Sequence, residues 1–124
     1  MRKVKLIKIT PKGEVDVMEA AEKYSDALLK QMQNEVKGYI ECVYAPRLGI
    51  NYMMIVNDEG MLIDLPVNAV ASYLYGADEH GGYIFGNALI AKNDWVDDGE
   101  LDVVAVPDEE VDELLGMIKK YFKC

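Results

Sequence analysis

Cysteine and histidine are scarce in this sequence of 124 residues, which contains two cysteines and one histidine. Cys42 lies within an apolar stretch and Cys124 is the last residue, so we do not expect a disulfide framework. Three such side chains are too few for the usual four-ligand structural zinc site, and we expect neither a metal nor another cofactor. A reducing cytosol is the simplest setting for this composition, so we expect a cytoplasmic protein.

Long hydrophobic runs are also absent, because no apolar segment approaches the ~20 residues that a membrane-spanning helix needs. Residues 1–10, MRKVKLIKIT, interleave basic and apolar side chains and lack the continuous apolar core of a signal peptide. Apolar residues make up 51% of the chain and charged residues 28%, which is globular composition. The length fits one domain, and we expect residues 1–124 to fold as a single unit.

Basic residues are outnumbered, with 13 lysines and arginines against 22 aspartates and glutamates and a net charge of −9. This balance argues against general nucleic-acid binding, which requires many cations to neutralise phosphates. A small anionic ligand stays possible, because a local pocket can be basic on an acidic protein. The acids are dense in residues 94–112, where they could attract a basic partner or mimic DNA, although a solvated acidic surface is the simpler interpretation.

Alternating and helical periodicities predict an α+β fold. The predicted strands are residues 3–9, 14–18, 39–44, 50–56, 61–63, 83–91 and 101–106, and the predicted helices are residues 25–37, 66–75 and 107–122. Turn residues between the strands predict two β-hairpins, 3–18 and 50–63. We expect one antiparallel or mixed sheet of about six to seven strands, covered by two to three helices.

The first strand has an irregular alternation. Val4 and Leu6 alternate with lysines, but the phase slips at Ile7. Either a β-bulge near Leu6 and Ile7 or burial of both faces at the far end of the strand would produce this pattern.

Recognisable catalytic motifs are missing, since the sequence contains no nucleophile elbow, P-loop or dinucleotide-binding fingerprint. His80 is the single histidine and lies between Glu79 and Gly81 in a predicted glycine-rich loop. No Ser-His-Asp order surrounds it. We therefore predict a protein that is not an enzyme, and the alternative is an acid/base role for His80.

The strand predicted at residues 83–91 carries the first candidates for ligand binding. Alternation places Tyr83, Phe85 and Asn87 on one face, where two rings and an amide could stack a nucleotide base and read its edge. The alternative is that these side chains pack under a helix or across a subunit interface.

Arg47 and two tyrosines complete the candidate set. Arg47 lies in a loop between strands and offers a planar fork of donors suited to phosphate or carboxylate, unless it is simply solvated. Tyr73 and Tyr75 lie near the end of the short predicted helix, where exposed tyrosines are common binding contacts. An ordinary amphipathic helix end is the alternative. The candidate ligand-binding residues are thus Arg47, Tyr73, Tyr75, His80, Tyr83, Phe85 and Asn87.

Three stretches resemble a family of small proteins from phages and other mobile elements that is catalogued as a domain of unknown function. The first, VKGYIECV (36–43), has a helix-end glycine and an aromatic-acidic strand. The second, IVNDEGMLIDLPVN (55–68), has a hairpin and a Leu-Pro-x-Asn segment. The third, IFGNALI (84–90), resembles an Ile-x-Gly-x-x-Leu strand. The resemblance implies an α+β fold and a phage or prophage source, and it assigns no catalytic residues.

In size and layout the chain is also similar to the phage Thoeris anti-defence sponge proteins. Those proteins assemble as oligomers and sequester cyclic ADP-ribose-type signals, and some also bind cyclic oligonucleotides. The similarity implies a non-catalytic sponge for a small nucleotide ligand, a homo-oligomer of two or more copies in the host bacterial cytosol. The alternative is an acidic protein–protein inhibitor or nucleic-acid mimic that acts on a host defence protein.

Overall fold

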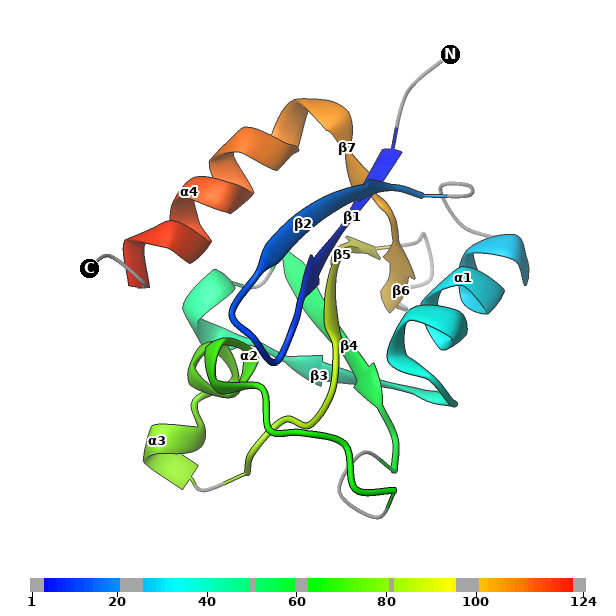
Figure 1. The fold of residues 1–124 in the computed structure, drawn as a ribbon. Helices are drawn as coiled ribbons and strands as arrows, with labels where there is room; N and C mark the ends of the chain where they lie inside the picture. Colours follow the sequence, from blue (N-terminus) through cyan, green and yellow to red (C-terminus); the bar gives the residue numbers. More distant parts are fainter. Residues whose placement is uncertain are drawn as a thin grey trace.

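The computed structural model describes residues 4–20, 26–49, 51–59, 63–80, 82–95 and 101–121. Within these ranges the chain forms an antiparallel sheet with helices on both faces (Figure 1). The strands are β1 (Val4–Ile9), β2 (Val15–Glu19), β3 (Ile40–Tyr44), β4 (Tyr52–Asn57), β5 (Ala88–Trp95), β6 (Leu101–Val104) and β7 (Val106–Pro107). The helices are α1 (Asp26–Val36), α2 (Ala69–Tyr75), α3 (Ala77–His80) and α4 (Val111–Tyr121), with 3-10 turns η1 (Pro46–Leu48) and η2 (Asp108–Glu110).

The sheet follows the order β2-β1-β5-β4-β3, and every recorded strand pair is antiparallel. The long strand β5 pairs with β1 near its start and with β6 near its end, while β7 pairs with the start of β1. The predicted α+β class is therefore confirmed, with an antiparallel rather than a mixed sheet. Among the described helices, none is long and apolar enough to cross a membrane.

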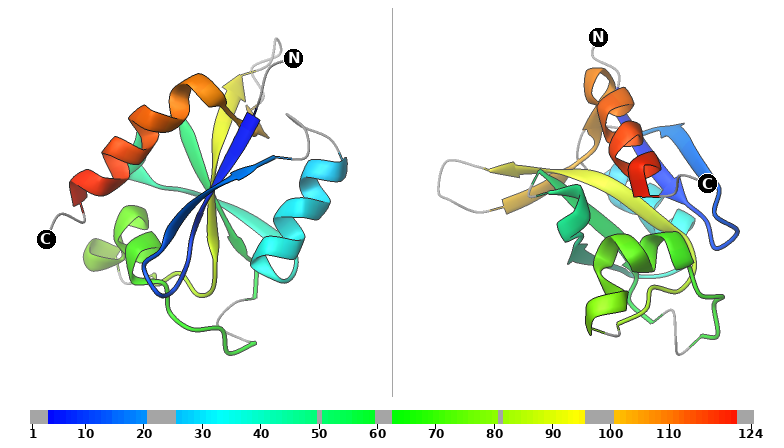
Figure 2. Two further views of the ribbon diagram at one scale, coloured as in Figure 1. Left: turned by 45° about the horizontal axis from the view of Figure 1, so that its top comes forward. Right: turned by 90° about the vertical axis from the view of Figure 1, so that its left-hand side faces the viewer.

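The sheet is buried on both faces, with α1 on one side and α2 and α4 on the other (Figure 2). This arrangement explains the irregular alternation in β1. Leu6 packs on the α1 side, whereas Ile7 and Ile9 pack on the α2 and α4 side, and all three are fully buried. The register with β2 advances residue by residue from Lys5 to Ile9, so burial of both faces, and not a bulge, is the correct alternative.

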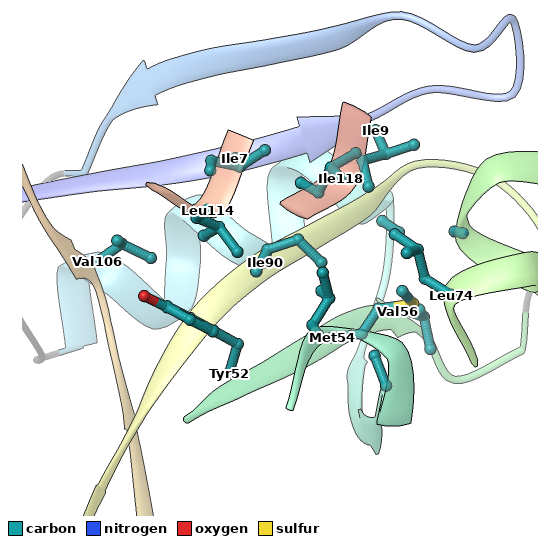
Figure 3. Packing of buried hydrophobic residues seen from close by; sticks show 14 of the residues in the cluster. Ile7, Ile9, Tyr52, Met54, Val56, Leu74, Ile90, Val106, Leu114 and Ile118 are labelled. Atoms are coloured by element: carbon teal, nitrogen blue, oxygen red, sulfur yellow. The ribbon is translucent and has the colours of Figure 1, made fainter. Parts of the chain in front are cut away.

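The larger core lies beneath α2 and α4 (Figure 3). Leu114 and Ile118 from α4 and Leu74 from α2 pack over the central strands β4 and β5. Each is at most 1% exposed, and burial of one such side chain contributes roughly 1.5–3 kcal/mol. The apolar stripe predicted for the last helix is thus the face that holds α4 on the sheet.

The predicted hairpin of residues 50–63 is wrong. β4 lies between β3 and β5, so both of its edges are already paired, and residues 63 and 64 form a turn. Residues 60–62 lie outside the described residues. The continuous apolar run of β4, which places Met54 and Val56 in one core and Ile55 in the other, is typical of an interior strand.

Two predicted boundaries also shift. The strand expected from residue 83 begins at Ala88, because Gly86 takes a positive φ of 79° that a regular strand does not allow. Before it, Phe85 makes only an isolated bridge with Val67. The helix expected from residue 66 begins at Ala69, because the Asn68 side chain accepts a hydrogen bond from Ala71 N and caps it.

Candidate functional site

A pocket of about 560 Å³ opens at the end of the sheet where β1 turns into β2. Its walls are the turn at residues 10–14, the end of α1 at residues 35–37, and residues 65–67 beside Gly86 and Asn87. In Figure 1 the β1–β2 turn, the chain that precedes α2 and the chain that enters β5 all lie at the lower end of the sheet. The volume falls within the roughly 300–1,000 Å³ of typical small-molecule sites.

Asn68 does not line this pocket, but it holds in place the segment that forms one wall of it. It is fully buried, and its Nδ2 donates hydrogen bonds to the backbone oxygens of Ile9 and Gly86, each at 2.8 Å. Its backbone N–H donates to the oxygen of Ile84, and the N–H of Gly86 donates to the oxygen of Pro66, each at 2.7 Å. One side chain therefore fixes the segment before α2 against both the end of β1 and the start of β5.

Gly86 allows the close approach of these two segments. A Cβ atom at this position would lie 2.7 Å from Leu65 Cδ1, and the positive φ disfavours any L side chain. The next residue, Asn87, donates from Nδ2 to the backbone oxygen of Glu35 at 2.9 Å. This bond satisfies a carbonyl in the last turn of α1, where no intrahelical donor is available.

The end of α1 is shaped by a left-handed residue. Lys37 has a φ of 67°, and the N–H of Gly38 donates to the oxygen of Gln33 at 3.0 Å. The helix therefore ends at Val36 with Lys37, and not Gly38, in the left-handed conformation. This geometry places Lys37 in the pocket lining.

The charge of the pocket differs from that of the chain. Two lysines and two glutamates line it. Lys12, Lys37 and Glu14 are exposed, and Glu35 is partly buried. Just outside the lining, Lys8 Nζ lies 3.1 Å from Glu35 Oε1 and offsets that carboxylate. Three lysines thus meet two glutamates, on a chain whose net charge is −9. An anionic group placed beside Lys12 and Lys37 gains Coulomb attraction from both ammonium groups.

The apolar part of the lining is supplied by Pro11, by Val36 from α1 and by residues 65–67, and Thr10 and Asn87 add polar groups. Val67 is 49% exposed, so part of this surface is open to solvent. Two lysines next to an exposed apolar wall can hold a small molecule that joins an anionic group to a flat or apolar part.

Arg47 and Tyr73, two of the predicted ligand-binding residues, lie together away from this pocket. The guanidinium carbon of Arg47 lies 4.0 Å from the centroid of the Tyr73 ring, and Nη1 donates to the Tyr73 backbone oxygen. Its Nη2 lies 3.7 Å from Glu79 Oε1. The arginine fork thus joins η1 to the end of α2 and to α3.

The other five candidates are scattered. Asn87 lines the pocket. Tyr75 is partly buried against the larger core, Phe85 is partly buried, and Tyr83 is 60% exposed. His80 is the last residue of α3, and its side chain lies outside what the structure describes. The described side chains of this candidate set do not form one site.

Sequence reasoning missed Lys12, Lys37 and the segment at residues 65–67. A signal for them was present, because each of the three stretches that carry the family resemblance contributes to the pocket lining. The first supplies Val36 and Lys37, the second supplies residues 65–67, and the third supplies Gly86 and Asn87.

A separate polar cluster fastens α4 to the sheet. Tyr52 Oη donates to Glu110 Oε1 at 2.9 Å, and the Lys92 ammonium donates to the other oxygen of the same carboxylate. Burial, followed by the hydrogen bond to Glu110 and the charges of Glu110 and Glu113, raises the pKa of Tyr52 well above its ordinary value. Its hydroxyl therefore stays protonated and acts as a structural donor.

Comparison with known proteins places the fold and the family. Among solved structures, the crystal structure of small RNA methyltransferase HEN1 is similar over 92% of this chain, with a TM-score of 0.55 and 17% sequence identity. The matched region is 16% of that protein's chain, and at this identity the likeness concerns the fold alone. No curated protein matches the sequence. The family model described as "Domain of unknown function (DUF3846)" matches residues 4–119, so the resemblance to an uncharacterised domain family is confirmed, and the chain belongs to the DUF3846 family.

Proposed function

We propose that this domain binds a small anionic ligand of the nucleotide class in the pocket between the β1–β2 turn, the end of α1 and residues 65–67. The observation that carries the proposal is the convergence of three separate family-like stretches on one pocket, which Lys12 and Lys37 line. A phosphate would lie toward Lys12 and Lys37, and a base or other flat group would lie against the exposed Pro66 and Val67.

The proposal is one of binding without chemical conversion. Glu35, a carboxylate that could otherwise act as a base, pairs with Lys8, and its backbone oxygen accepts from Asn87. Both contacts give it a structural role at the end of α1. The biological role proposed for this binding is sequestration. The domain would hold cyclic nucleotide signals, such as cyclic ADP-ribose isomers or cyclic oligonucleotides, and so counter a host defence.

Titration calorimetry with cyclic ADP-ribose isomers, cyclic di- and trinucleotides, AMP and inorganic phosphate tests the proposal. We expect at least one nucleotide to bind with micromolar or tighter affinity, and mass spectrometry should recover it unchanged after release. Failure of the whole panel to bind would remove the proposal, and recovery of a cleaved product would replace binding with catalysis.

A charge-reversal pair tests the position of the site. Lys12→Glu should weaken nucleotide binding by at least about tenfold, because a charged hydrogen bond contributes roughly 1.5–3 kcal/mol. Lys30→Glu makes the same change of net charge at an exposed position of α1 that does not line the pocket, and binding should stay within about twofold of wild type. Equal losses in both variants would mean that the ligand senses overall charge and not this pocket.

The alternative of an acidic inhibitor stays a prediction, and the described acids of residues 94–112 lend it little support. Glu110 is engaged by Tyr52 and Lys92. Asp108 and Glu109 lie in η2 just before α4, where they complement the helix dipole. Asp97, Asp98 and Glu100 lie outside the described residues.

A further inference from the structure

One edge of the sheet is open for pairing with another strand. β3 pairs with β4 on one side only, and within the described ranges no strand lies against its other side. The backbone N–H of Asp58 donates to the oxygen of Tyr39, which makes these two residues a hydrogen-bonded pair. Because such pairs alternate along an antiparallel ladder, the backbone groups of Ile40, Cys42 and Tyr44 face away from β4.

The side chains along this edge are mostly apolar. Tyr39 is 75% exposed, Tyr44 is 47% exposed, and Cys42 is also exposed. The opposite edge of the sheet, β2, carries Asp16 and Glu19 among its five residues. Charged side chains are a common protection of edge strands against pairing, and β3 has only Glu41. The two edges therefore differ in their fitness for strand addition.

We propose that β3 pairs in antiparallel fashion with β3 of a second copy of this chain, about a twofold axis at Cys42. In this register Ile40 lies opposite Tyr44 of the second copy, and Glu41 lies opposite Val43 of the second copy. All five residues of β3 then find partners, and the two sheets join into one. The edge is self-complementary, as an interface on a twofold axis must be.

Charge disfavours one neighbouring register, and a proline disfavours the other. An axis at Glu41 would place two carboxylates directly opposite each other, which is destabilising in a strand pair. An axis at Val43 would extend the pairing toward Pro46, which begins η1 and has no N–H to donate. The axis at Cys42 avoids both penalties. This inference goes beyond the pocket and does not depend on it.

Sedimentation over a concentration series, with a cysteine cross-link as a second measurement, tests the interface. The axis at Cys42 places the two Cys42 Cα atoms about 5.5 Å apart, as in any hydrogen-bonded antiparallel pair. Disulfides span Cα separations of roughly 4.4–6.8 Å, so a mild oxidant should link the two copies. The experiment uses Cys124→Ser protein, so that Cys42 is the single thiol.

Matched substitutions on the two edges complete the design. Tyr44→Lys should raise the concentration at which half of the chains are paired by about tenfold or more, because the axis repeats the change at two contacts. Cys42→Lys, at another exposed position, should have the same effect if Tyr44→Lys folds poorly. Val17→Lys alters an exposed position on the β2 edge and should leave pairing unchanged.

The expected result is a dimer that cross-links through Cys42, weakens with either β3 variant and persists with Val17→Lys. A monomer at every concentration up to the hundred-micromolar range would overturn the proposal. A dimer whose affinity is unchanged in the β3 variants would also overturn it, as would a dimer that Val17→Lys disrupts. Nucleotide binding by a protein that stays monomeric would contradict this interface alone and leave the proposed function standing.

Discussion

Asn87 Nδ2 donates a hydrogen bond of 2.9 Å to the backbone oxygen of Glu35, and this bond joins the start of β5 to the last turn of α1. The two residues are 52 positions apart in the sequence. Glu35 also contacts Lys8 of β1, so three elements of the fold meet beside the pocket. The pocket is therefore held by contacts between elements and not by a single loop.

Substitutions of Asn87 should separate its donor role from its size. Asn87→Ala should lower the free energy of unfolding by about 1 kcal/mol, the usual value of one hydrogen bond. Asn87→Asp should cost more at neutral pH, because a carboxylate would face a carbonyl oxygen at the negative end of the α1 dipole. Urea denaturation measures both. Equal stability of Asn87→Asp and wild type would contradict this role.

Asn68→Ala should be among the more destabilising changes of a single polar residue in this chain. The substitution removes three hydrogen bonds and leaves the oxygens of Ile9 and Gly86 and the N–H of Ala71 without their Asn68 partner. We expect a loss of about 3 kcal/mol or more of unfolding free energy. Asn34→Ala, at an exposed position of α1, is the control and should stay within about 0.5 kcal/mol of wild type.

Two glycines should respond in opposite directions to alanine. A Cβ at Gly38 would lie 2.7 Å from Asn57 Nδ2, and that side chain is fixed by bonds to Val36 O and Glu59 N. Gly38→Ala should therefore lower the melting temperature. Gly116 in α4 has open space around it, so Gly116→Ala should stabilise the protein by roughly 0.5–1 kcal/mol. A Gly38→Ala protein that melts at or above the wild-type temperature would show that Asn57 moves freely.

Tyr52→Phe should change the alkaline limit of stability. In the folded protein the pKa of Tyr52 is raised by burial and by Glu110, while in the unfolded chain it is about 10. The folded state therefore keeps a proton that the unfolded state loses, and the stability from Tyr52 is present below pH ~10 and is lost as the pH rises toward the raised pKa. Tyr52→Phe should be less stable at neutral pH by about 1 kcal/mol and lose less stability between roughly pH 10 and 11. If the unfolding free energies of the two proteins fell equally with pH in that range, the raised pKa of Tyr52 would be contradicted.

Local patterns predicted much of this fold. The alternation and turn of residues 3–18 predicted the β1–β2 hairpin, and the apolar stripes of α1 and α4 predicted helices that the structure contains. The hairpin expected at residues 50–63 failed because pairing is decided by partners distant in sequence. β4 is occupied by β3 and β5, which no local turn signal reveals.

The candidate site was less accessible to sequence reasoning. Tyr83, Phe85 and Asn87 were assigned one face of a strand, but the left-handed Gly86 breaks that strand, and Asn87 turns to Glu35. Arg47 was a candidate for binding phosphate or carboxylate, with a solvated arginine as the alternative, and in the structure it contacts Tyr73 and Glu79. The pocket residues Lys12 and Lys37 lie 25 positions apart on a turn and a helix end, so only the tertiary fold brings them together.

The most direct test of the account is amide chemical-shift mapping by NMR, with whichever nucleotide of the calorimetry panel binds most tightly. Binding in the proposed pocket predicts that the largest shifts fall on residues 10–14, Lys37, Gly86 and Asn87. Shifts concentrated instead on Arg47, Tyr73 and Tyr83, with the β1–β2 turn unchanged, would contradict the claim that this pocket is the ligand site.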